Sequence, residues 1–175
     1  MESWQSFYVI IGSAGAALIG IQFVVVTLVA SMRRRPPMES FSAFGTPTVL
    51  HLSGALLVSA VMTAPWPSIV AVSRTLTACG LAGLVYCGIV IRRTLRQTYY
   101  VPVWQDWLWF SFCPISLCAT LTVGAVLLRT RTYIALFVIA AAALGLLLMA
   151  IRNAWDSVTH LIVIRGDDED ETRVE

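Results

Sequence analysis

Residues 133–151 read YIALFVIAAAALGLLLMAI and are followed directly by Arg152. No side chain in this stretch is ionised, and a helix needs roughly 20 apolar residues to cross the hydrocarbon of a bilayer. Water is absent there, so the backbone must satisfy its own hydrogen bonds, which a helix does within one segment. The stretch therefore predicts a transmembrane helix.

The composition of the whole chain agrees with this prediction. Apolar residues make up 58% of the sequence and charged residues only 13%, with a mean hydropathy of +0.78. A soluble domain carries roughly 25% charged residues. The polar residues are too few to cover a water-soluble globule, so we expect the bilayer to be the solvent for most of the chain.

Four more apolar stretches precede residue 133, and Thr46-Pro47 predicts the start of the second. We therefore predict an all-α fold, an integral membrane bundle of about five transmembrane helices, with spans at about 7–30, 47–64, 68–91, 107–128 and 133–151. Residues 1–165 form this bundle, the last helix continuing to residue 165 as a cytoplasmic helical extension. Residues 166–175 carry five consecutive acids, and their mutual repulsion predicts a disordered tail. A re-entrant second span is the alternative, and it would leave four crossings.

The arginines indicate the orientation. The chain has no lysine, and nine of its twelve arginines fall after the first, third and fifth spans. Short cytoplasmic segments are enriched in basic residues. We expect the N-terminus outside and the C-terminus in the cytoplasm.

Small residues recur every four positions on the first span, at Gly12, Ala16 and Gly20. Such spacing lets two helix backbones approach closely, which favours association where lipid gives no hydrophobic drive. The sequence leaves open whether the facing helix belongs to this chain or to another subunit. A homo-oligomer or a membrane-protein partner is expected beside the lipid bilayer itself.

The candidate functional residues are polar groups predicted near the cytoplasmic ends of the spans. His51 lies within the second span, where ionisable residues usually face protein or water. Arg152, Asp156 and His160 are spaced four apart, so they share one helix face. The predicted polar cluster consists of His51, Asp106, Arg152, Asp156 and His160. The alternatives are a neutral histidine bonded to a backbone carbonyl and a solvated helix end with weak ion pairs.

Several kinds of chemistry find no support in the sequence. Two metal-ligand candidates at helical spacing, Asp156 and His160, do not make a zinc site. No cofactor, nucleotide-phosphate or nucleophile motif is present, so nothing argues for an enzyme, and no basic face suits nucleic acid. The cysteines fall inside apolar stretches without a Cys-x-x-Cys pair and are expected to be packing residues: Cys79, Cys87, Cys113 and Cys118.

Two stretches, AFGTPTVLHLSGALL (residues 43–57) and RNAWDSVTHLIV (residues 152–163), have motif quality. In them the chain resembles a loose group of small bacterial multi-span inner-membrane proteins of unknown function. The resemblance implies no substrate or catalytic residue. It draws attention to Thr46, Pro47, His51, Asn153, Trp155 and Asp156.

Two classes of function follow from the sequence. The function we predict is that of an oligomeric protein that lets protons or small ions permeate past His51 and the polar cluster. The other is a non-catalytic scaffold or accessory subunit of a larger membrane complex. Polar residues gather mainly at one end of the predicted bundle, which leans toward the second class or toward a gated pore.

The orientation gives a direct prediction. Topology reporters fused after Met38, Arg96, Arg129 and Arg165 should read inside, inside, outside and inside, because the arginine-rich segments stay in the cytoplasm. An external reporter after Arg165 would overturn the five-span topology.

Overall fold

The computed structural model describes residues 2–31, 38–96, 109 and 112–174, with side chains at 4–28, 46–92, 109, 112–156 and 158–159. Five helices make up nearly all of the described chain. They are α1 (Glu2–Ser31), α2 (Met38–Thr63), α3 (Ile69–Arg96), α5 (Cys113–Leu127) and α6 (Thr132–Val174). The predicted all-α architecture is confirmed.

Four of the helices are long and apolar enough to cross a membrane, over Trp4–Leu28, Thr46–Thr63, Ile69–Arg92 and Thr132–Asp156. Each of these segments overlaps one of the predicted spans. The remaining predicted span, the fourth in chain order at 107–128, corresponds to the shorter apolar helix α5, which has 15 residues. The chain is therefore a multi-helix protein whose apolar segments are compatible with a membrane.

Two local predictions were wrong. Pro47, expected to begin a helix, lies inside α2, which already starts at Met38. Proline interrupts only one backbone hydrogen bond of a helix, so the apolar segment after it can still continue a helix begun earlier. The acidic tail, predicted to be disordered, is helical to Val174, because extending an existing helix avoids the cost of nucleation.

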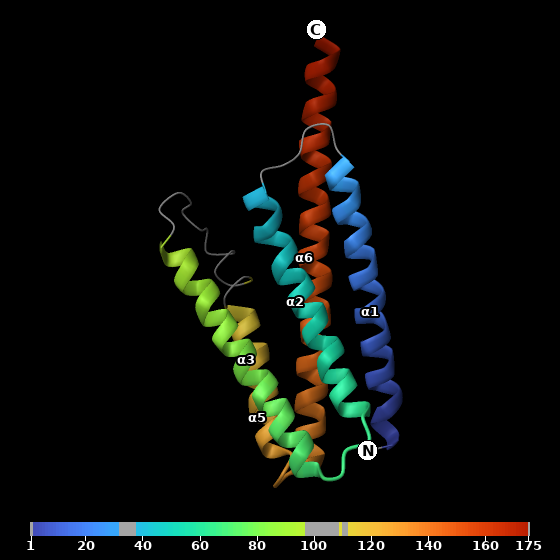
Figure 1. Cartoon of the computed structure of the whole chain (residues 1–175), viewed down its shortest axis with the longest axis vertical. Helices are drawn as coiled ribbons and strands as arrows, with labels where there is room; N and C mark the ends of the chain where they lie inside the picture. Colours follow the sequence, from blue (N-terminus) through green and yellow to red (C-terminus); the bar gives the residue numbers. More distant parts are fainter. Residues whose placement is uncertain (1, 32–37, 97–108, 110–111, 175) are drawn as a thin grey trace.

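The helices run up and down, and the two chain ends lie at opposite ends of the molecule (Figure 1). We call the end with the N-terminus, the 64–68 connection and the 128–131 turn the N-terminal end of the bundle. The other is the C-terminal end, where α6 projects well beyond its neighbours. With 43 residues, α6 is about 65 Å long, roughly twice the thickness of the hydrocarbon.

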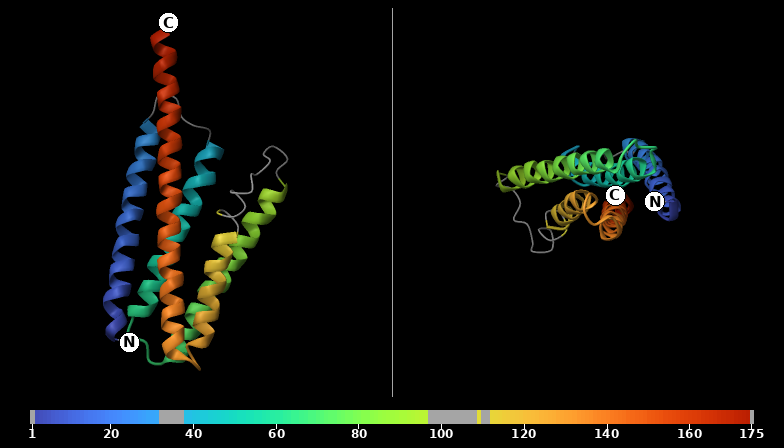
Figure 2. Two further views of the ribbon diagram at one scale, coloured as in Figure 1. Left: turned by 180° about the vertical axis from the view of Figure 1, so that it is seen from behind. Right: turned by 90° about the horizontal axis from the view of Figure 1, so that it is seen from below.

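Helix α6 lies at the centre of the arrangement. It packs against α2 on one side and α5 on another, while α1 packs mainly on α2 and α3 mainly on α5. The α3–α5 pair is tilted away from α6 toward the C-terminal end, as both side views show (Figures 1 and 2). The residues of α6 that face its neighbours include four fully buried alanines, Ala135, Ala142, Ala143 and Ala150, interspersed with larger buried side chains such as Ile139 and Leu146.

Aromatic rings join α1 to α6 at the N-terminal end of the bundle. The ring of Trp4 contacts that of Phe137 edge-on, with centroids 4.7 Å apart, and Phe137 also contacts Tyr133. Tyr8 packs beside Trp4 and is almost fully buried. These contacts fix the start of α1 against the start of α6.

The α1–α2 contact runs through Gly12 and Gly15. A Cβ atom at Gly12 would lie 3.0 Å from Cβ of Ser59, and one at Gly15 would lie 3.4 Å from the carbonyl oxygen of Leu52. Ala16 and Gly20 are exposed on α1, and a Cβ atom at Gly20 would meet nothing within 4 Å. Of the three predicted packing residues, Gly12 alone lies in this internal contact.

The α3–α5 contact is closer still. Gly80 faces Thr122, and an added Cβ there would lie 3.1 Å from the backbone nitrogen of Thr122. The hydroxyl of Ser73 donates a hydrogen bond to the carbonyl oxygen of Ala125 at 2.7 Å, and this bond is buried. Small residues and interhelical hydrogen bonding therefore join these helices, as expected for packing in lipid.

The two glycines Gly80 and Gly88 of α3 form a matched pair for testing this contact. Gly80→Ala should lower stability in detergent by about 1–3 kcal/mol, since backbone atoms of α5 cannot move aside cheaply. Gly88→Ala meets nothing within 4 Å and should be neutral or stabilising by up to about 1 kcal/mol. Thermal unfolding of both variants in one detergent measures the difference. Equal melting temperatures would mean that α3 and α5 do not pack at Gly80.

A candidate functional site at the C-terminal end of the bundle

Arg152 lies on α6 near the C-terminal end of the bundle, one turn before Asp156. It lies 20 residues beyond the start of α6 at Thr132, a rise of about 30 Å, which equals the thickness of the hydrocarbon. If Thr132 marks one boundary of the membrane, Arg152 marks the other. A guanidinium at that level can reach the lipid headgroups while its stem stays in apolar surroundings.

Two described groups contact Arg152. Its Nε lies 3.5 Å from Oδ2 of Asp156, one turn further along α6, and both side chains are about two-fifths exposed. Its guanidinium carbon lies 3.6 Å from the centroid of the Trp109 ring. The face of an indole ring attracts a cation. An exposed ion pair alone holds a side chain weakly, so the stacking contact adds to the orientation of Arg152.

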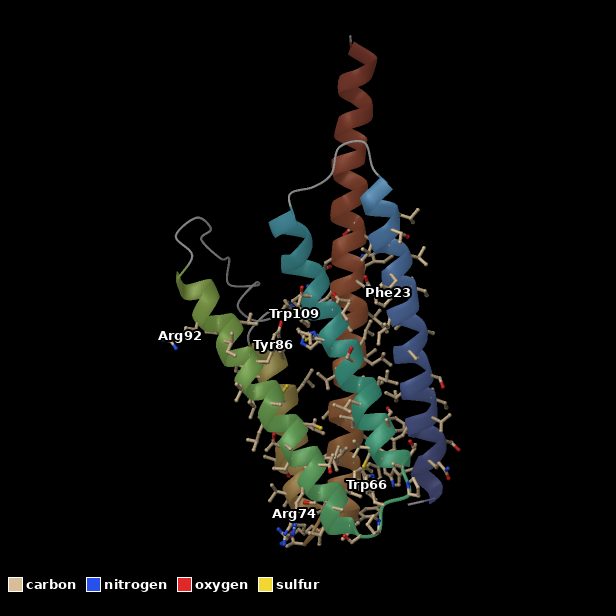
Figure 3. All side chains as sticks on the ribbon, in the orientation of Figure 1. Phe23, Trp66, Arg74, Tyr86, Arg92 and Trp109 are labelled. Atoms are coloured by element: carbon tan, nitrogen blue, oxygen red, sulfur yellow. The ribbon has the colours of Figure 1, made fainter. Side chains whose placement is uncertain are left out.

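The contact with Trp109 is absent from the sequence-based prediction, which does not single out this tryptophan. Figure 3 shows Trp109 on the side of the α3–α5 pair that faces α6. The two residues are far apart in the sequence, and which helix an aromatic ring faces depends on tertiary packing, so no local pattern reveals the contact.

A groove of about 430 Å³ lies between α5 and α6 next to this pair. Its walls are almost wholly apolar, and Arg152 and Trp109 lie at one end. Its lining residues are Trp109, Phe112, Cys113, Ser116, Leu117, Gly145, Leu148, Met149 and Arg152. On α6 the positions of Gly145, Met149 and Arg152 are spaced i, i+4 and i+7, so the groove follows one face of that helix.

His51 lies on α2, on the other side of α6. Gly54, three residues further along α2, lies near Leu146 of α6. A Cβ atom added at Gly54 would lie 3.5 Å from the Leu146 side chain. Since α2 and α6 are antiparallel, His51 lies near the level of Met149, about one turn short of Arg152. Its Nδ1 is buried and has no hydrogen-bond partner among the described residues.

The predicted polar cluster is thus placed in part. Arg152 and Asp156 are together, whereas His51 has no ion pair or hydrogen bond with Asp156 within the described part of the chain. Asp106 and the side chain of His160 lie outside the described residues.

Thr48 on α2 and Asn153 on α6 are buried polar residues near the same end. The resemblance drew attention to Asn153. Thr48 was not a candidate, because a threonine in an apolar helix gives no signal of its burial.

Two cysteines form a contact that spacing in the sequence does not reveal. The thiols of Cys87 on α3 and Cys118 on α5 are hydrogen-bonded to each other, and both residues are buried. Nearby Gly83 leaves room for Cys118, since a Cβ there would lie 2.7 Å from Sγ. The pair therefore belongs to the α3–α5 packing. Among the described residues, no three His, Cys, Asp or Glu side chains group in a way that could hold a metal ion.

Comparison of the chain with protein families, with curated proteins and with solved structures gives no match.

Proposed function

We propose that this multi-pass membrane protein is a non-catalytic scaffold or accessory subunit that acts through the outer faces of its helices. The observation that carries the proposal is the apolar packing at the centre of the described bundle. Leu52, Ala55 and Val58 of α2 are buried in the same core as Ala143 and Leu146 of α6. Side chains at close packing leave little room for a water path between these two helices.

The outer face of α1, formed by Ser13, Ala16, Ala17 and Gly20, supports an assembly role. All four residues are exposed on α1, and the internal seam runs instead through Gly12 and Gly15. A face of small residues permits close approach of another helix in lipid. We therefore propose that a second copy of the chain packs on this face.

The assembly proposal predicts that Gly20→Leu weakens self-association, because a bulky side chain would separate the two backbones. Gly88→Leu on α3 is the matched control, since both glycines have open space at Cβ. Subunit counting by single-molecule photobleaching in liposomes should give multimers for the wild type and Gly88→Leu, and single chains for Gly20→Leu. Single chains in the wild type, or multimers in Gly20→Leu, would contradict assembly through this face.

A second candidate is permeation of protons or small ions, favoured by the buried, unpartnered Nδ1 of His51. On α6, Arg152 lies about one turn from the level of His51 and Asp156 about two turns from it. Because the α2–α6 contact is apolar, a path past His51 would run along an outer surface of the chain, between subunits.

Permeation predicts proton flux into liposomes above that of protein-free liposomes, with a pH dependence that follows the protonation of His51. His51→Gln should remove that pH dependence, and so should Asp156→Asn if the carboxylate acts with the imidazole. Ser53→Ala, two residues away on α2, is the control and should keep it. Flux equal to that of protein-free liposomes at every pH would leave the scaffold as the function.

We also propose the orientation with the N-terminus outside and the C-terminus in the cytoplasm. The positions of the termini at opposite ends of the bundle support an odd number of crossings (Figure 1). The distribution of arginines chooses between the two orientations.

A further inference from the structure

The α5–α6 groove has the dimensions and lining of a site for a hydrocarbon chain. Its volume of about 430 Å³ exceeds that of a large side chain, and pockets of roughly 300–1,000 Å³ hold small ligands. Among the described residues of its lining, Ser116 is the one with a hydroxyl, and that hydroxyl already donates to the carbonyl oxygen of Phe112 at 2.8 Å. The walls therefore offer dispersion contacts and almost no hydrogen bonds.

The chemistry changes at the end of the groove, where the guanidinium of Arg152 lies. Its ion pair with Asp156 engages Nε, and its stacking on Trp109 engages the flat face of the group. Arginine carries five N–H donors, four of them on the terminal nitrogens. The terminal nitrogens have no hydrogen-bond or ion-pair partner among the described residues, so they remain suited to an anion.

The position along α6 fixes what kind of anion this is. Arg152 lies about 30 Å along the helix from Thr132, so with Thr132 at one boundary of the hydrocarbon, Arg152 lies where the other boundary meets the headgroups. The groove extends from Arg152 toward Gly145, which is toward the middle of the membrane. An occupant must therefore have a negative charge at the headgroup level and an apolar chain running inward.

We propose that the α5–α6 groove holds one acyl chain of an anionic phospholipid, with the lipid phosphate bound to the guanidinium of Arg152. Trp109 orients the guanidinium by stacking, and the apolar walls exclude water from the chain. Asp156 opposes the binding of an anion, because its carboxylate competes for the same guanidinium. This site is independent of the outer face of α1, which belongs to another side of the bundle.

The test is competitive binding of dioleoyl phosphatidylglycerol and dioleoyl phosphatidylcholine to the full chain in detergent, followed by native mass spectrometry. The two lipids share acyl chains and differ in headgroup charge. Both lipids carry a phosphate, but the choline of phosphatidylcholine cancels its charge, so one arginine near the membrane surface should give about a fivefold preference for the net negative phosphatidylglycerol. Arg152→Gln should reduce the preference to about one, Arg152→Lys should keep most of it, and Asp156→Asn should increase it.

Arg92→Gln is the matched control for loss of charge. Arg92 lies on α3 toward the C-terminal end and points away from the bundle (Figure 3), so its removal should leave the preference unchanged. Ser116→Phe fills the groove and should reduce the binding of both lipids. Size-exclusion chromatography confirms that each variant is folded. An equal preference in folded Arg152→Gln and wild type, or an equal loss in Arg92→Gln, would overturn the proposal.

Discussion

The close contact of α6 with α2 and α5 is the constraint on which the rest of the fold depends. A helix in lipid gains little from burying apolar surface against another helix, so packing must come from short distances between backbones. Fully buried alanines supply this on α6. On α5, Gly124 serves the same purpose, since an added Cβ would lie 3.3 Å from the backbone nitrogen of Ile139. Helices α1 and α3 are then placed by their own glycine contacts with α2 and α5.

The sequence was sufficient for the all-α fold class, because each apolar stretch must satisfy its backbone within the membrane. It was insufficient for the contacts between the helices. The spacing of Gly12, Ala16 and Gly20 suggested one seam, but the internal seam uses Gly12 with Gly15, a spacing of three residues. Both spacings bring small residues onto one side of a helix, and only the position of α2 decides between them. The contacts of Gly80 and Gly83 were missed for the same reason.

In the polar region too, local sequence patterns predict some contacts and miss those that depend on tertiary packing. The pairing of Arg152 with Asp156 follows from helical spacing alone, and it was predicted. The stacking of Arg152 on Trp109 joins residues more than 40 positions apart in the sequence, so no local pattern contains it.

In the acidic tail, by contrast, a local pattern was present but pointed away from the helix that the structure has. Local charge repulsion argued for disorder, but a long helix entering the tail from the bundle carries its hydrogen-bonding pattern onward at low cost.

The geometry of α6 separates the two polar features that the sequence had joined into one cluster. Leu146, beside Gly54 of α2, is six positions from Arg152, which at 3.6 residues per turn places the two about 120° apart around the helix. Arg152 therefore lies on the side of α6 that faces α5, with Trp109 and the groove. His51 and Thr48 both belong to α2, which packs on a different side of α6. A charge bound at Arg152 would act on His51 only across the width of α6. Any coupling between lipid binding on one side and titration on the other must pass through this helix, whose small buried residues leave its neighbours little freedom to shift independently.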